Sequence, residues 1–187
     1  MFLLKYEDRP CSHSEFVDFW SAQYDPGKDA DRDYWQNITS PFTPEKVRNL
    51  FKWKNGSKLS ATKESSVEKH FVANVGLLSQ IPKDESAAKF LARFPYGGPI
   101  FRIFWLHCWR PELFPIYDMH VHRAMEFIEK RQLIEIPSDP SEKVEAYLNR
   151  YLDFHAGFKG GQRAIDQALW AYGKFLKSYP KFSLAPK

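Results

Sequence analysis

The sequence has few cysteines and no long apolar run, and both shortages exclude classes of protein. Its 187 residues include 2 cysteines, Cys11 and Cys108, which form no Cys-x-x-Cys pair. A four-cysteine iron–sulfur cluster or zinc site therefore cannot be built within this chain. The longest apolar run, around Ile103–Trp109, is interrupted by His107 and flanked by arginines. It is too short to cross a bilayer, so we expect no membrane partner.

We expect no targeting segment at the beginning of this sequence, and the histidines form no metal-binding pattern. Met1–Leu4 is shorter than a secretory signal requires, and charged residues follow from Lys5 onward. Three histidines are isolated in the sequence, which does not favour a metal site: His13, His70 and His155. We expect a cytoplasmic monomer that uses no cofactor and no metal.

Strand patterns are missing as well, whereas apolar residues recur at helical spacing between Pro, Gly and Asp breaks. The composition is 43% hydrophobic and 17% aromatic, which is enough for a well-packed core. The sequence therefore predicts one all-α domain over residues 1–187, compact and with room for two lobes.

Helix boundaries can be placed in the first half of the chain. Thr43, followed by a proline, is typical of a helix start, and Gly56 is expected to end that helix. A longer helix is expected to begin at Ser60 or Thr62 and to reach Leu78, because apolar residues recur there at helical spacing.

Further helices are expected in the second half. Asp84 is the expected cap of a short helix, and Ile100–Trp109 is apolar on nearly all sides, which indicates a buried helix. Asp118–Lys130 is amphipathic, and two C-terminal helices are expected within residues 141–179.

The most informative stretch is Pro115–Arg123. Asp118 follows a short apolar run and opens a helix that continues with His, Val, His and Arg. A lone carboxylate is costly to bury, so Asp118 is either a helix cap or a working acid. Upstream of it lies a glycine-containing turn, Phe94–Pro99, followed by the apolar helix.

A glycine turn, an apolar helix and then Pro-Ile-x-Asp-x-His-Val-x-Arg together resemble the core of the helix–hairpin–helix DNA glycosylases, the endonuclease III and adenine glycosylase (HhH-GPD) superfamily. The resemblance covers about residues 94–130, and the late helix containing Asp166 and Trp170 is similar to the one that closes the same domain in adenine glycosylases. It implies a hydrolase that cleaves the N-glycosidic bond of a damaged or modified base after base flipping from DNA.

The resemblance assigns roles to the residues of the aspartate segment. Asp118 falls on the catalytic aspartate, which stabilises the sugar cation and positions water. His120 falls on a histidine that lies near the DNA backbone. Arg123 falls on a basic position that is either structural or phosphate-facing, and His122, without a counterpart, is expected at the surface.

The resemblance also identifies Tyr96, Gly97 and Gly98 as the hairpin whose backbone N–H groups would bind a DNA phosphate. Here the glycines are adjacent and followed by Pro99, unlike the usual Leu-Pro-Gly-x-Gly pattern, and proline has no N–H to donate. Bifunctional members carry a lysine at the position of Ile100. An alkyl side chain cannot act as a nucleophile, so the resemblance implies a monofunctional enzyme without a lyase step from that position.

Residues Trp53, Lys54 and Asn55 form a polar turn beside an aromatic side chain. They are candidates for a base pocket or for the wedge that replaces a flipped base, and a plain helix end explains them equally well. Several lysines near this turn could contact phosphates: Lys52, Lys54, Lys58 and Lys63.

Other functions stay open at this point. A net charge of +4 is compatible with a DNA partner but does not require one. A non-catalytic helix–hairpin–helix DNA-binding module and an all-α interaction protein are the alternatives to an enzyme. For an enzyme, the sequence leaves open DNA repair by base excision or anti-phage defence by removal of a hypermodified phage base.

Overall fold

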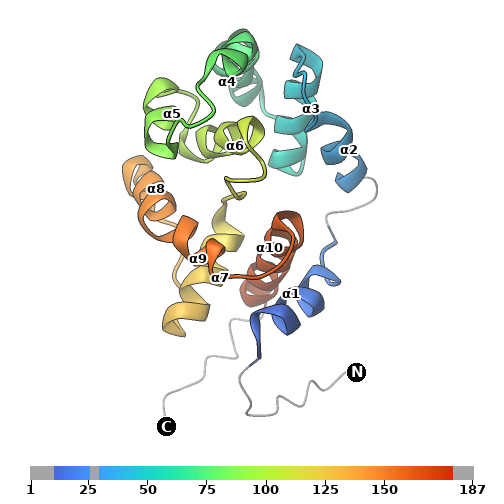
Figure 1. The fold of residues 1–187 in the computed structure, drawn as a ribbon, viewed down its shortest axis with the longest axis vertical. Coiled ribbons are helices and arrows are strands. Elements are labelled where there is room, and N and C mark those ends of the chain that lie inside the picture. The colour runs from blue at the N-terminus through green and yellow to red at the C-terminus, as the bar shows by residue number, and fades with distance from the viewer. Residues whose placement is uncertain (1–10, 26–29, 179–187) are drawn as a thin grey trace.

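The computed structural model describes residues 11–25 and 30–178, and every regular element within them is a helix, as predicted. Figure 1 shows two groups of helices joined through the segment after α6. The first group contains α2 (Ala30–Asn37), α3 (Pro44–Asn55), α4 (Ala61–His70), the 3₁₀ helix η1 (Val72–Gln80), α5 (Ala87–Arg93) and α6 (Pro99–Trp109). The second contains α1 (His13–Ser21), α7 (Met119–Lys130), α8 (Pro140–Ala146), the π-helical η2 (Tyr147–Tyr151), α9 (Leu152–Ala156) and α10 (Gln162–Ser178).

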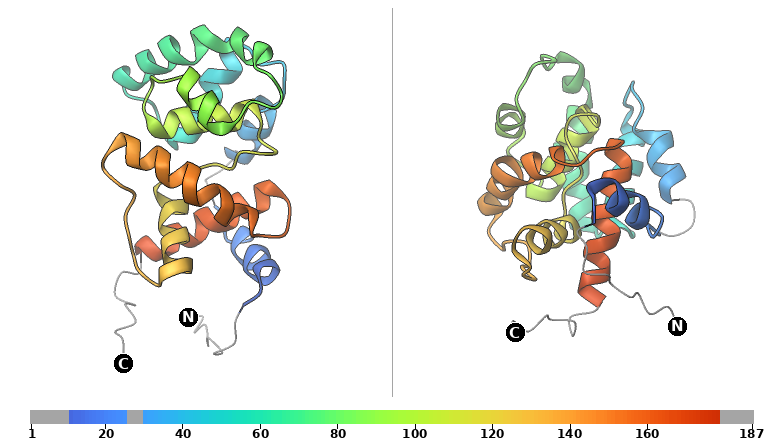
Figure 2. Two further views of the ribbon diagram at one scale, coloured as in Figure 1. Left: turned by 60° about the vertical axis from the view of Figure 1, so that its left-hand side comes forward. Right: turned by 60° about the horizontal axis from the view of Figure 1, so that its bottom comes forward.

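One hydrophobic core extends through both groups. Helix α6 lies inside it, with Ile103, Phe104 and Trp105 fully buried, as its apolar sequence predicted. It packs against α5 in its own group and against α8 in the other. In the second group α10 lies against both α1 and α7, which the two views of Figure 2 also show. The two groups therefore form a continuous structure.

The boundaries of α3 are those predicted from the sequence. The Thr43 hydroxyl accepts a hydrogen bond from the N–H of Lys46, and Pro44 occupies the first turn. Gly56 ends the helix in the left-handed conformation, with φ of 70°. The last turn of α3 contains Trp53 and Lys54.

The predicted long helix up to Leu78 is wrong in its second half. Helix α4 begins after the Ser60 cap and ends at His70, because Phe71 leaves helical geometry with φ of −120°. A 3₁₀ helix follows, in which residues three apart lie on one side. Val72 and Leu78, and between them Val75, share that spacing and face the core.

The predicted cap at Asp84 is also wrong. Asp84 lies in a turn closed by the hydrogen bond from the N–H of Glu85 to the carbonyl of Pro82. The cap of α5 is Ser86, whose hydroxyl accepts from the N–H of Lys89.

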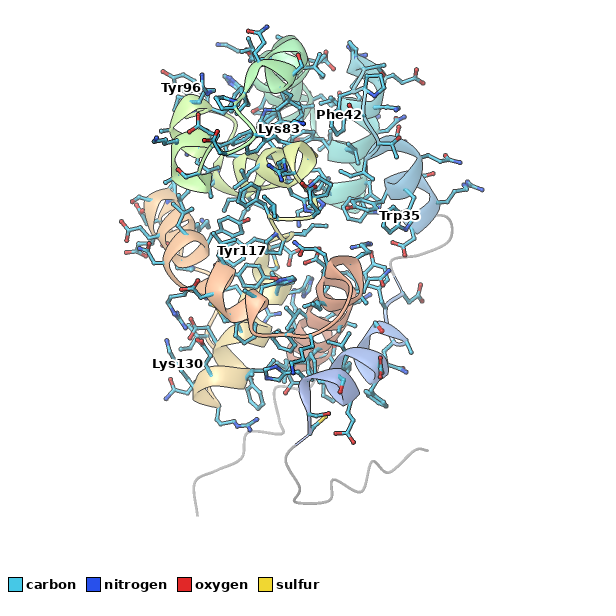
Figure 3. The ribbon with its side chains drawn as sticks, viewed as in Figure 1. Trp35, Phe42, Lys83, Tyr96, Tyr117 and Lys130 are labelled. Atoms are coloured by element: carbon cyan, nitrogen blue, oxygen red, sulfur yellow. The ribbon has the colours of Figure 1, made fainter. Side chains whose placement is uncertain are left out.

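Both expected C-terminal helices are present. The first runs on from α8 through η2 to the end of α9, and it begins at Pro140 behind the Asp139 cap. The π segment within it places Tyr147 and Tyr151 fully inside the core. In Figure 3, Tyr117 lies in the interior of the molecule, between the two groups of helices.

Candidate active site

Asp118 caps helix α7 with one oxygen of its carboxylate. Its Oδ1 accepts hydrogen bonds from the N–H of His120 at 2.8 Å and of Val121 at 3.3 Å, which caps α7. These two bonds fix the carboxylate and leave Oδ2 available for other contacts. The two interpretations drawn from the sequence are therefore compatible.

Lys54 provides that other contact. Its Nζ lies 2.9 Å from Asp118 Oδ2, and the two residues are 64 positions apart in the sequence. The Lys54 side chain is 4% exposed and that of Asp118 is 19% exposed. The ion pair therefore joins the end of α3 to the start of α7, across the two groups of helices.

The charge around Asp118 keeps it ionised. Burial alone would raise the pKa of its carboxyl, but the ammonium of Lys54, the nearby His120 and the N–H of Val121 together lower it below its ordinary value. Asp118 is therefore a carboxylate at neutral pH.

The lowered pKa predicts how this ion pair contributes to stability as the pH changes. A carboxyl whose pKa is depressed by folding adds stability above its unfolded pKa of about 3.9, and that contribution is lost as the pH falls through the lower folded value. We expect the difference in unfolding free energy between wild type and Asp118→Asn to shrink below about pH 4. Urea unfolding between neutral and acid pH measures it; a constant difference would contradict the pairing.

A pocket of about 500 Å³ lies at this ion pair, within the range of small-molecule sites. Both Asp118 and Lys54 line it. Its aromatic lining comes from Tyr24, Trp53 and Trp170, and its amide groups come from Gln36, Asn37 and Asn49. A pocket with flat apolar walls, several amides and a fixed carboxylate can hold a planar heterocycle attached to a polar group.

Trp53, Lys54 and Asn55 form the last turn of α3, as a plain helix end predicts, and the first two of them also line the pocket. Trp53 is half-buried and its ring contacts Tyr34 and Phe104, so it does not protrude. Asn55 is no part of the pocket lining; its amide binds Ser57 and accepts a hydrogen bond from Lys63. Asn55 therefore faces its own loop and does not line this pocket.

Two buried tyrosines that were not predicted from the sequence hold the segment before Asp118. The hydroxyls of Tyr147 and Tyr151 donate to the carbonyls of Pro115 and Ile116, at 3.3 Å and 3.2 Å. Both tyrosines come from the π segment, a type of helix irregularity that is frequent at functional sites. The only sequence signal was the presence of two aromatic residues four positions apart, which equally indicates plain core packing.

Asp166 is a second carboxylate in the pocket lining. It is 2% exposed and its Oδ1 accepts from the N–H of Ile116 at 3.3 Å. His155 Nε2 lies 3.3 Å from the same oxygen, while Oδ2 has no hydrogen-bond partner among the described residues. Asp166 thus anchors the aspartate segment from α10 and keeps one oxygen unused.

The predicted hairpin residues lie between α5 and α6, outside the pocket lining. Gly97 and Gly98 have φ of 98° and 83°, which favours glycine, and a Cβ on Gly97 would overlap the ring of Phe71. Tyr96 is 68% exposed and projects from the outer edge of the first group of helices (Figure 3). The turn therefore packs its backbone at Gly97 against Phe71 and exposes the ring of Tyr96 to solvent.

The basic residues that follow Asp118 are mostly internal. Arg123 is 2% exposed; its guanidinium forms a bidentate pair with Glu135 and donates to the carbonyl of Gly173 at 2.9 Å. The phosphate-facing alternative for Arg123 is therefore wrong, and the structural one agrees with the contacts. His122, expected at the surface, is buried beside Tyr117, with Tyr117 Oη 2.7 Å from its Nδ1.

His120 is half-buried, and its ring lies 5.3 Å from that of Trp170. Burial lowers its pKa, so it is neutral at neutral pH. Ile100 lies in the first turn of α6 and packs against the core. Lys52 and Lys58 line the pocket from exposed positions, whereas Lys63 is hydrogen-bonded to Asn55.

Comparison with protein families, curated proteins and solved structures finds no significant match for this chain. In the described part of the chain no helix is long and apolar enough to cross a membrane. The same residues contain no cluster of three or more His, Cys, Asp or Glu side chains that could hold a metal ion.

Proposed function

We propose that the protein is a DNA glycosylase that excises a damaged or modified base. One observation carries the proposal: Asp118, the acid singled out by its sequence context, is an ionised carboxylate fixed in the wall of a pocket with aromatic sides. The helix–hairpin–helix resemblance named the same residue from local pattern alone.

The carboxylate has the properties that base excision requires. Positive charge develops on C1′ and O4′ of the sugar as the glycosidic bond breaks, and an anion held in place stabilises that charge without reorganising. The N–H groups of His120 and Val121 hold Asp118 in place, and its lowered pKa keeps it charged.

The pocket supplies the recognition of a flipped base. Trp53 and Trp170 give the pocket aromatic surface against which a base can pack, and Asn37 and Asn49 line the same pocket with amide groups that can meet its polar edge. Asn49 donates to the side-chain oxygen of Asn37, which fixes both amides. A pocket that reads polar edges through fixed amides can select one base over others.

The groups that would bind the DNA backbone are exposed lysines of the pocket and the turn before α6. Lys52 and Lys58 are at its rim, where they can meet phosphates. The Tyr96–Gly98 turn precedes the first N–H groups of α6, an arrangement that favours a phosphate.

Base release tests the proposed function directly. The protein would be incubated with oxidised, alkylated, deaminated and mismatched duplexes and with hypermodified phage genomes, with abasic sites scored by alkaline cleavage and free bases identified by mass spectrometry. Release of a base from any of these DNAs supports the proposal. Release from a damaged or mismatched duplex would indicate repair, and release from a hypermodified phage genome would indicate defence. Salt-sensitive binding without release would favour a binding module, and no binding at all would favour an interaction protein.

The exposed turn gives a prediction for DNA binding. Tyr96→Ala is expected to weaken duplex binding about fivefold, on the order of 1 kcal/mol, because an exposed ring that stacks on DNA is lost. The melting temperature should not change, since Tyr96 is 68% exposed. Fluorescence anisotropy measures the affinity, with Leu133→Ala, another exposed apolar residue, as control. Equal affinity of Tyr96→Ala and wild type would remove this turn from the interface.

A further inference from the structure

Arg163 is a cation in the pocket wall that has no part in stabilising a sugar cation. It lies in the first turn of α10 and lines the pocket, with its side chain 13% exposed. The central carbon of its guanidinium, Cζ, lies 4.6 Å from the centre of the Tyr34 ring, 5.1 Å from that of Tyr24 and 5.3 Å from that of Trp53. A guanidinium stays protonated in proteins. The pocket therefore contains a permanent positive charge packed among aromatic rings.

Asp31 and Tyr24 hold one end of this guanidinium. Arg163 Nη2 donates to Tyr24 Oη at 3.0 Å and to Asp31 Oδ1 at 2.5 Å, and Gln167 donates to the other oxygen of Asp31 at 2.6 Å. Among the described residues Nε and Nη1 have no hydrogen-bond partner, and Nε is buried. Because Arg163 lines the pocket, the two N–H groups of Nη1 can meet a ligand there, in a direction that the planar guanidinium fixes.

The other charged groups of the pocket wall either have partners or are exposed. Lys54 is paired with Asp118. Asp166 Oδ1 accepts from the N–H of Ile116, and its Oδ2 is buried. Three further charged residues of the lining are exposed: Lys52, Lys58 and Asp33. The half-buried wall therefore offers a bound molecule a cationic donor, Arg163, and the group that such a donor selects is an acceptor oxygen.

We propose that Arg163 binds a carbonyl oxygen of the flipped base and stabilises the negative charge that the base carries as it leaves. The inference rests on the proposed glycosylase function and names its substrate class. That class is a neutral base that presents a carbonyl group, such as uracil or hypoxanthine. An alkylated base that already carries a positive charge is excluded, because Arg163 repels it and its departure needs no cation.

The reaction balances with water as the only further reactant. The C1′–N bond breaks and its electron pair goes to the base, where resonance shares the negative charge between the ring nitrogen and the carbonyl oxygen. That oxygen accepts from Nη1 of Arg163, and the charge-assisted hydrogen bond strengthens as the charge develops. Water then bonds to C1′ and loses a proton, and the base anion takes up a proton to leave as the neutral base. The sugar cation meets Asp118 and the base anion meets Arg163, so each developing charge has a fixed counter-charge.

Matched pairs of free bases test the inference without requiring base release. Uracil and cytosine have nearly the same size, but uracil carries a carbonyl where cytosine carries an amino group; hypoxanthine and adenine form a second such pair. Binding would be followed by quenching of tryptophan fluorescence, since Trp53 and Trp170 line the pocket. We expect the carbonyl member of at least one pair to bind at least about tenfold more tightly than its partner. Arg163→Gln should abolish that preference.

Arg48→Gln is the matched control. Arg48 also pairs with a carboxylate, that of Glu68, but it is no part of the pocket lining, so the preference should remain. Inorganic phosphate would be titrated into the same proteins, because a backbone phosphate is the other oxygen acceptor that a guanidinium binds. If Arg163→Gln loses phosphate binding and keeps the preference between bases, Arg163 belongs to the DNA backbone and the inference is overturned. Thermal unfolding shows whether each variant is folded.

The outcomes separate this inference from the function on which it rests. A wild-type protein that binds both members of each pair equally, or binds neither, would overturn the role of Arg163, and that measurement needs no folded variant. Base release from DNA confined to cationic alkylated bases would also overturn it and leave the glycosylase standing. A preference lost in Arg163→Gln, without base release from any DNA, would support Arg163 and contradict the glycosylase.

The rate of base release tests the second half of the inference. On DNA from which a carbonyl-bearing base is released, single-turnover release by Arg163→Gln should fall at least about tenfold, whereas Arg48→Gln should release at the wild-type rate. A wild-type rate in Arg163→Gln would overturn its part in the reaction.

Discussion

Asp118→Asn is expected to lower base release at least about 1,000-fold, or about 4 kcal/mol of transition-state stabilisation. The amide keeps an oxygen that can accept from the N–H groups of His120 and Val121, so the start of α7 is preserved. It carries no charge to oppose the developing sugar cation. Single-turnover base release, measured on the DNA identified by the substrate panel, gives the ratio of rate constants.

The stability of this variant needs a matched comparison. Removing the anion leaves the buried ammonium of Lys54 without its counter-charge, which is expected to cost about 3 kcal/mol. The double variant Asp118→Asn with Lys54→Met removes both charges and should recover most of that stability while staying inactive. Urea unfolding of wild type, both single variants and the double variant completes the cycle. A folded Asp118→Asn protein that releases base at the wild-type rate would end the catalytic assignment.

Asp118 could be found from the sequence because its evidence is local. The pattern consists of a carboxylate at a helix start followed by His, Val and Arg, all within a few consecutive residues. A helix cap depends on the residues next to it in the sequence, so it can be predicted from them. Lys54 could be placed near a pocket but not beside Asp118, since the contact joins residues 64 positions apart. The sequence also did not show that Lys54 lines the pocket and Asn55 does not. Successive residues on a helix point about 100° apart, but the direction of the pocket was unknown.

The sequence could not assign the buried polar residues for the same reason. Arg123 pairs with Glu135, beyond the end of its helix, and with the backbone of Gly173 on α10. The sequence around a basic residue beside a candidate site does not show whether its side chain faces a phosphate or an internal carboxylate. Asp166 lies in the pocket wall, but the sequence named it only as part of a helix that resembles one in adenine glycosylases. Its partner, the N–H of Ile116, comes from a segment that is distant in the sequence.

Gly173→Ala is expected to be strongly destabilising, although alanine is the better helix former by about 1 kcal/mol. Gly173 lies where α10 crosses the start of α7, and a Cβ there would overlap the carbonyl group of His120. That obstacle is backbone, so it can move only if the two helices separate. We expect a net loss of about 2 kcal/mol or more in unfolding free energy, measured by urea titration, because overpacking of about 3 kcal/mol outweighs the helix propensity.

The same close approach links Gly173 to the candidate active site. Its carbonyl accepts the hydrogen bond from Arg123, and the His120 carbonyl that it touches lies two residues after Asp118. Separation of α7 from α10 would therefore displace the carboxylate, so base release should fall more steeply than the folded fraction. Gly76→Ala is the control, because a Cβ there meets no atom within 4 Å, and its stability should change by less than about 1 kcal/mol. If Gly173→Ala were as stable as Gly76→Ala and fully active, close contact between α7 and α10 would not be what holds Asp118 in place.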